Sequence, residues 1–324
     1  MKGLTDYLTE HSWEDTLIAT FVFVDACLSE AQRQADFRRR RGPEPAHDDS
    51  VSITIALAAE NGFDGDEDKA LAFLRQYHGD LWSSGIPDVR RFNVRRRTLT
   101  LVLEDIRRQL RDRWRAQRPA ADNANADDGN LTARLRCVDS APVIWASRPR
   151  GHASPIAAPE DRHEWFGVCT RQHFKFFGDR FHAPVDCDQM LDEWVVAPGA
   201  YNDFKVLPAR CDGYHDLIYI GDKGYVDAKT EDWVWERGRH LLLPLRRDNQ
   251  HNQWPEGIQR ILGRLRHGIE TACSVLTTAF TLRFPHSRSW TGCLARLVSK
   301  TLAYTLSFFL AQRAAAQPVK ALAI

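Results

Sequence analysis

Three acidic residues stand beside apolar segments, where an unpaired charge is unfavourable. Asp139 ends the run LRCVD, Asp222 ends the run LIYIGD, and Glu270 lies on RLRHGIETACSVL, close to its apolar stripe. Two carboxylates at strand ends and one from a packed helix supply the oxygen donors that Mg²⁺ and Mn²⁺ require. Two such ions, about 4 Å apart, stabilise the attacking and leaving oxygens of an in-line phosphoryl transfer. Each acid taken alone is more often structural, so the prediction rests on all three lying beside core segments.

The segments that carry these acids indicate an α/β arrangement. Short apolar runs bounded by turn residues predict strands in residues 135–145, 174–186, 190–203, 217–225 and 240–245. Turns are expected at Gly178 and Gly199. Helical periodicity predicts helices in residues 229–238, 256–280 and 291–313. Strands that come first, with helices interleaved later, predict a mixed sheet flanked by helices.

The first third of the chain has helical periodicity in residues 13–28, 48–62 and 66–82, and in residues 89–118 as one long helix or two. Between Asp88 and Arg118, eleven arginines stand against four acids. A helix-turn-helix-like DNA-binding region fits this pattern, and a helix with a solvated charged face is the alternative. Because arginine contacts phosphate bidentately, we expect DNA contacts from Arg90, Arg91, Arg95, Arg96 and Arg97. The run Arg38–Arg41 is either a solvated tether or a phosphate-contacting arm.

Small polar residues in the stretch PAADNANADDGN predict a linker. The expected division is a helical region at 1–118, a linker at 119–131, a catalytic domain at 132–313 and a tail at 314–324. The 324 residues are 43% hydrophobic with a net charge of +1, as in an ordinary globular protein. Seven cysteines without a C-x-x-C pair argue against a zinc knuckle and are expected to be reduced core residues. The apolar runs are too short and interrupted to span a bilayer, so no membrane partner is expected.

The motifs around the three acids resemble those of DDE transposases of bacterial insertion sequences. VDSAPV resembles the first-aspartate motif, GDKGY the second, and RHGIET the glutamate signature, with an arginine four residues before the glutamate. FKFFGDRFHAPVD and APGAYND resemble the intervening strands, in which PG is followed by a short gap and an aspartate, here Asp203. FNVRRRTL resembles the arginine-rich segment that precedes the catalytic domain in some of these families. Together the resemblance covers most of residues 48–312.

Two positions depart from the pattern of many relatives. Gly263 stands where a tyrosine precedes the signature arginine, and Thr277 stands where a lysine follows the glutamate. These differences leave open the subgroup and the side chains that grip the terminal nucleotides. They do not affect the three expected metal ligands.

The resemblance implies a ribonuclease-H-like catalytic domain that binds two Mg²⁺ or Mn²⁺ ions through Asp139, Asp222 and Glu270. It implies a DNA transposase that cleaves at the ends of a mobile element and joins the freed 3′-OH to target DNA. The expected partners are double-stranded DNA, as element ends and target, and a second copy of the chain in the DNA complex. The expected location is the cytoplasm, in association with the nucleoid. A catalytically inactive DNA-binding derivative and a metal-dependent structure-specific nuclease without strand transfer are the alternatives.

The residues next to the acids receive supporting roles. Arg266 lies one helical turn before Glu270, so it is either free for a substrate phosphate or an ordinary salt-bridge partner. Lys223 is expected to contact a phosphate. Gly224 is expected to let the backbone turn sharply, and Tyr225 to pack under that turn.

Overall fold

The computed structural model describes residues 13–34, 45–117, 131–154, 156, 160–169, 173–207, 214–245 and 253–316. The run Arg38–Arg41 and nearly all of the expected linker lie outside these ranges. Two compact units make up the chain. The first contains residues 1–117, 279–281 and 289–324, and the second contains residues 118–278 and 282–288.

The first unit is helical. Its described helices are α2 (Trp13–Gln34), α3 (Asp49–Gly62), α4 (Glu67–Tyr77), α5 (Val89–Thr98), α6 (Thr100–Ala116) and α12 (Trp290–Ala316). Aspartate caps start α4 and α5, since Asp66 accepts a hydrogen bond from Lys69 N and Asp88 accepts one from Arg91 N. The segment that the sequence left as one helix or two is two helices, which meet at Leu99.

Helix α12 differs from its expected place. The sequence put it at the end of the catalytic domain, but it groups with the amino-terminal helices and contacts α3, α5 and α6. Leu297, Leu302, Leu306 and Leu310 are all buried. Among the described helices, α12 is long and apolar enough to cross a membrane, but 83% of that stretch is buried inside the protein. It therefore serves as a core helix of this unit.

The second unit contains a six-stranded mixed sheet. Its strands are β1 (Leu135–Ser147), β2 (Phe166–Cys169), β3 (Phe174–Val185), β4 (Val195–Pro198), β5 (Ile218–Gly221) and β6 (Leu241–Pro244). The order is β2-β3-β1-β5-β6, and β4 pairs with β3. β1 is antiparallel to β3 and parallel to β5, which is parallel to β6. The predicted mixed sheet is thus confirmed.

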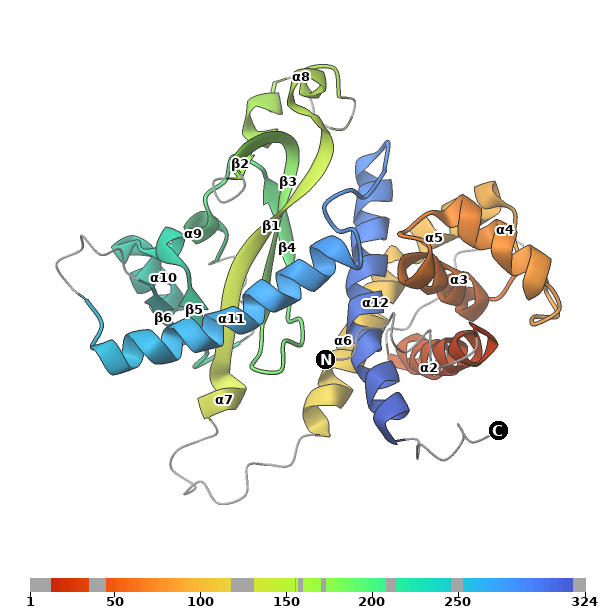
Figure 1. The fold of residues 1–324 in the computed structure, drawn as a ribbon, viewed down its shortest axis with the longest axis horizontal. Helices are drawn as coiled ribbons and strands as arrows, with labels where there is room; N and C mark the ends of the chain where they lie inside the picture. Colours follow the sequence, from red (N-terminus) through yellow and green to blue (C-terminus); the bar gives the residue numbers. More distant parts are fainter. Residues whose placement is uncertain are drawn as a thin grey trace. The chain divides into compact units, whose positions relative to one another are not determined.

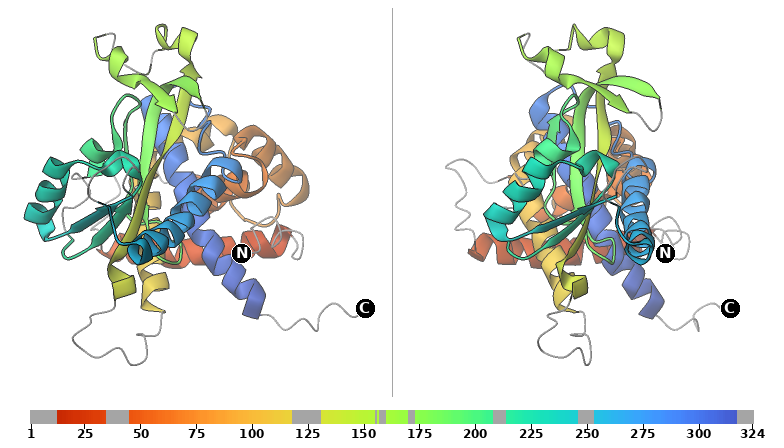
Figure 2. Two further views of the ribbon diagram at one scale, coloured as in Figure 1. Left: turned by 60° about the vertical axis from the view of Figure 1, so that its left-hand side comes forward. Right: turned by 90° about the vertical axis from the view of Figure 1, so that its left-hand side faces the viewer.

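Helices cover both faces of this sheet. The described helices of this unit are α7 (Leu131–Arg134), α8 (Arg148–Gly151), α9 (Asp203–Val206), α10 (Ala228–Gly238) and α11 (Glu256–Thr278), with the 3₁₀ turns η1 (Arg162–Trp165) and η3 (Lys223–Tyr225), and α10 and α11 are the ones that cover the faces. The long helix α11 crosses β1 (Figure 1). Figure 2 shows α11 on one face of the sheet and α10 on the other. An α/β unit with helices on both sides is the architecture expected from the sequence.

Gly178 does not form the predicted turn. β3 continues through it, opposite Ile144, next to a bulge in β1 between Ile144 and Ala146. Its φ is +158°, and an added Cβ would lie 2.0 Å from Val143 O. Glycine is therefore required here because the neighbouring strand approaches too closely for any side chain.

The cysteines are only partly core residues. Among the described cysteines, Cys27, Cys137 and Cys293 are buried, Cys169 and Cys273 are partly buried, and Cys187 is exposed.

Candidate functional site

The sheet register brings Asp139 and Asp222 together, although Asp139 lies inside the long strand β1 and not at the strand end that the sequence predicted. The parallel ladder between β1 and β5 pairs Leu135 with Ile218 and ends at Cys137 with Ile220. Asp139 and Asp222 each lie two residues beyond that last pair. Neighbouring strands are about 4.8 Å apart, so the two carboxylates start from adjacent positions at the same level of the sheet.

The turn after β5 holds Asp222 in place. Its Oδ1 accepts a hydrogen bond from Gly224 N at 2.7 Å. The backbone turns at Gly224 as expected, in the 3₁₀ turn Lys223–Tyr225, but the φ of Gly224 is not positive. An added Cβ at Gly224 would lie 2.9 Å from Asp222 Oδ1, so a side chain here would displace that carboxylate from its hydrogen bond. Tyr225 is buried and packs against Gly221, as the sequence predicted.

Helix α11 brings Glu270 to the same region. Cys137 Sγ lies 3.2 Å from Leu265 O and bonds the helix to β1 two residues before Asp139. Glu270 follows Leu265 by five residues, about 7.5 Å along the helix axis. Its Oε1 is 3.1 Å from Arg266 Nη2, and both side chains are partly buried. The salt bridge that the sequence left as one of two possibilities is therefore present.

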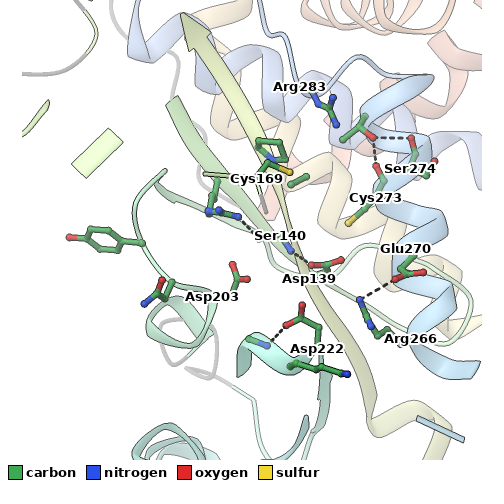
Figure 3. A pocket seen from close by; sticks show the side chains of 18 of the residues that line it. Asp139, Ser140, Cys169, Asp203, Asp222, Arg266, Glu270, Cys273, Ser274 and Arg283 are labelled. Carbon is green, nitrogen blue, oxygen red and sulfur yellow. Dashed lines mark hydrogen bonds and ion pairs between the residues drawn. The ribbon is translucent and has the colours of Figure 1, made fainter. Parts of the chain in front are cut away.

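All five residues predicted for the catalytic unit line one cavity of about 960 Å³ (Figure 3). These are Asp139, Asp222, Lys223, Arg266 and Glu270. Figure 3 shows Asp139 on its strand between Asp222 and Glu270. Cations and carboxylates thus share the walls of one open space, as a site for an anionic substrate and a divalent cation would require.

Burial and neighbouring acids change the protonation of Asp139. The pKa of Asp139 is raised to about 7, mainly by burial and also by the charges of Asp222 and Asp203. A hydrogen bond from Ser140 N, at 2.8 Å, and the charge of Arg266 act in the opposite direction. Asp139 therefore lies within electrostatic reach of two other carboxylates, which is the condition that a bound cation relieves.

Asp203 is a cavity residue that the sequence analysis did not place in the site. It begins α9, and its Oδ1 is 3.5 Å from Nδ1 of the buried His182. Burial raises the pKa of Asp203, and a hydrogen bond with Ser140 opposes that rise. The signal available in the sequence was the aspartate of APGAYND, which follows a predicted strand, as Asp139 and Asp222 do.

The donor set fits a hard cation. The three predicted ligands offer carboxylate oxygens, and burial raises the pKa of the nearby Cys273 well above its usual value, so this thiol stays protonated. Among the described residues, no three acidic, imidazole or thiolate groups yet converge on one point. Glu270 turns toward Arg266 and Asp222 toward Gly224 N, so these two side chains must rotate to share an ion.

The chain matches no protein-family model, and neither the curated proteins nor the solved structures contain a significant match to it.

The five arginines predicted to contact DNA have different environments in the first unit. Arg90, Arg91 and Arg97 are exposed, whereas Arg95 Nη2 is 2.5 Å from Asp49 Oδ1. Arg96 is only 2% exposed and forms a buried ion pair with Glu67, to which Arg296 also pairs. The prediction of a DNA contact for Arg96 is therefore wrong, because its guanidinium is enclosed by the helix packing.

Proposed function

We propose that this protein is a DNA transposase of the DDE type, which cuts at the ends of a mobile element and joins the 3′-OH ends to target DNA. One observation carries the proposal: Asp139, Asp222 and Glu270 come from distant parts of the sequence and line the same cavity. Burial and, to a smaller extent, the charge of Asp222 raise the pKa of Asp139, as expected for a cation-binding cluster before the cation binds.

The chain's own residues have separate tasks in this reaction. Asp139, Asp222 and Glu270 would hold two Mg²⁺ or Mn²⁺ ions, which stabilise the attacking and leaving oxygens when bound. Arg266, once it leaves Glu270, binds a phosphate oxygen of the substrate. Lys223 is exposed at the mouth of the cavity and adds a second cation there.

The sheet order is compatible with a ribonuclease-H-like fold. Three parallel strands, β1, β5 and β6, continue into an antiparallel set formed by β3, β2 and β4. This arrangement favours the proposal because the ladder between β1 and β5 ends just before Asp139 and Asp222, which therefore lie beside each other.

The first unit is the proposed DNA-binding region. α5 exposes Arg90, Arg91 and Arg97, and it also exposes 53% of Val94. Cations bind phosphates, while an apolar side chain on the same helix can contact base edges in a groove. In this proposal the exposed side of α5 faces duplex DNA. α3 and α4 add a helix-turn-helix-like pair, joined by four residues that include Gly65 at φ +77°.

The proposed partners are double-stranded DNA and a second copy of the chain. A mobile element has two ends, and each end needs a catalytic site at the moment of joining. A homodimer with twofold symmetry supplies two identical sites, so we propose that the DNA complex contains two chains. The proposed location is the cytoplasm, in association with the nucleoid.

A joining assay tests the proposal. Full-length protein, Mg²⁺, a duplex with the inverted repeats that flank the gene and a supercoiled target plasmid are incubated together. Plasmid joined to the duplex supports transposition. Nicked plasmid without joined product supports a nuclease without strand transfer, and a gel shift without either product supports an inactive DNA-binding derivative.

A further inference from the structure

The cavity extends well beyond the three acids. Six of its lining residues lie along α11, from Arg266 through Glu270 to Thr278. Twelve residues of α-helix span about 18 Å, so the cavity is longer than one phosphate group. Figure 3 shows Arg283 at the end of the cavity opposite Asp222. The acidic end therefore accounts for only part of the space.

Arg283 is held firmly at the far end. Its carbonyl oxygen accepts a hydrogen bond from Ile144 N at 2.8 Å, which fixes the backbone to β1. Its guanidinium lies over the ring of Phe174, 5.5 Å from the centroid. Within the described residues, the buried Nε of Arg283 has no hydrogen-bond partner. A buried donor of this kind is unfavourable unless an acceptor reaches it, and for a guanidinium the preferred acceptor is an anion.

Two neighbours indicate which anion fits. Ser274 lines the cavity with an exposed side chain, and a serine hydroxyl donates readily to a phosphate oxygen. Phe284, which follows Arg283 and also lines the cavity, is 47% exposed. An exposed aromatic ring beside a phosphate-binding arginine gives a nucleobase a surface for stacking. A position for a phosphate next to a position for a base fits a nucleotide of a DNA strand better than it fits an inorganic anion.

We propose that Arg283 and Ser274 bind a phosphodiester of the DNA strand that enters the acidic end of the cavity, with the adjacent base against Phe284. This assignment rests on the proposed function, since it takes the substrate to be DNA. Along α11, Ser274 and Thr278 lie about 6 and 12 Å beyond Glu270. At about 3.4 Å of rise per nucleotide, the bound phosphate is about two to four nucleotides from the reacting one.

Methylphosphonate interference tests the subsite. A series of duplexes is made with the inverted repeats that flank the gene. Each duplex carries a single uncharged methylphosphonate, placed at a different one of the last phosphates of the strand to be joined. Binding to the full-length protein is measured by fluorescence anisotropy for wild type, Arg283→Ala and Arg283→Lys. Arg288→Ala is the matched control, because Arg288 is an exposed arginine of the same segment and does not line the cavity.

Wild type and Arg288→Ala should bind about tenfold more weakly when the methylphosphonate is about two to four nucleotides from the reactive end. Arg283→Ala should bind that duplex and the unmodified duplex equally. The phosphate charge removed from the DNA and the guanidinium removed from the protein belong to one contact, so losing the second after the first has no further effect. The salt dependence of DNA binding by Arg283→Ala should also fall by about one counterion. Arg283→Lys keeps the charge and should keep the interference at the same phosphate.

If Arg283→Ala shows the same interference profile as wild type, the proposed subsite is wrong. The proposed function still stands in that case, provided that the wild-type protein joins the ends to target DNA. If wild type binds DNA but neither cuts nor joins it, the proposed function fails, and loss of interference in Arg283→Ala still supports the subsite. Failure of the wild-type protein to bind any duplex overturns both.

Discussion

Arg266 Nη2 lies 3.1 Å from Glu270 Oε1, one helical turn away on α11. The glutamate expected to hold a cation is therefore neutralised by the arginine expected to hold a phosphate. Cation binding at Glu270 competes with this ion pair, and phosphate binding at Arg266 breaks it from the other side. The two events should therefore favour one another, so that the site loads completely only when cation and DNA are both present.

Replacing Arg266 by alanine should slow DNA cleavage more than it weakens cation binding. The phosphate loses its guanidinium, while Glu270 keeps both oxygens for the ion. The melting temperature should change little, since i,i+4 pairs of this kind contribute about 0.3–0.5 kcal/mol. Cleavage rates and the Mn²⁺-induced rise in melting temperature measure the two effects. Arg260→Ala is the control, because Arg260 forms the same type of pair with Glu256 on α11. A collapse of the melting temperature in Arg266→Ala alone would make the pair structural.

Asp139→Asn should abolish cleavage without lowering the metal-free stability above pH 7. Burial raises the pKa of Asp139 to about 7, so between about pH 4 and pH 7 the folded protein holds a proton that the unfolded chain releases. The contribution of Asp139 to the free energy of unfolding is therefore lost as the pH rises through that window. Asparagine does not titrate, so the variant should not show this loss. Thermal melts at pH 5 and pH 8, with and without Mg²⁺, test this. A variant that is less stable than wild type at pH 8 without metal would mark Asp139 as a structural acid.

Cleavage should increase as the pH rises through about 7, because a cation competes with the proton on Asp139. The charge of Asp203 contributes to the raised pKa of Asp139, so Asp203→Asn should move the midpoint of the pH–rate profile to lower pH. Asp232→Asn, a change of an exposed acid on α10, should leave the midpoint in place. Identical midpoints for Asp203→Asn and wild type would show that Asp203 does not act on Asp139.

Asp179 should make stability pH-dependent without any effect of metal. It is 2% exposed, and burial raises the pKa of Asp179 to about 8, although Trp165 Nε1 donates a hydrogen bond to its Oδ1. The folded protein keeps this proton from about pH 4 to pH 8, so stability falls across that range by up to about 1.4 kcal/mol per pH unit. Asp179→Asn should flatten the slope in chemical denaturation followed by tryptophan fluorescence. An unchanged slope would contradict the assignment.

Arg97→Ala and Arg96→Ala should have opposite phenotypes. Arg97 is exposed on α5, so its loss should reduce the salt dependence of DNA binding by about one counterion and leave the fold unchanged. Arg96 is buried against Glu67, and breaking a buried pair costs about 3–5 kcal/mol. Melting curves and binding measured at several salt concentrations separate the two effects. These need the full chain, because a fragment of residues 1–118 lacks α12.

Local patterns in the sequence predicted most of the elements. Hydrophobic periodicity identified the helices, and α10 ends at Gly238, where the sequence predicted its end. The same periodicity also indicates that Arg96 is buried, although the sequence analysis predicted a DNA contact for it. Val89, Phe92, Arg96 and Leu99 follow helical spacing, so Arg96 shares the apolar side of α5 and its burial could have been inferred.

Long-range packing was harder to predict. The apolar pattern of α12 shows that it is buried but not which helices bury it, and so its place in the first unit was missed. Asp203 was missed as a site residue because α9 has only four residues and no periodicity. Its proximity to Asp139 depends on pairing between β3 and β4, which no local pattern specifies. Asp139 and Asp222 were easier, since each follows the apolar residues that form the parallel ladder between β1 and β5.

The yield of joined product from three isosteric variants tests the central claim most directly. Asp139→Asn, Asp222→Asn and Glu270→Gln each keep the size of the side chain and remove one charged ligand. With Mg²⁺, pre-cleaved ends and a target plasmid, wild type should form joined product, and each variant should form almost none while still binding the ends. Joined product at the wild-type rate from any one variant, or none from wild type with either Mg²⁺ or Mn²⁺, would contradict the account.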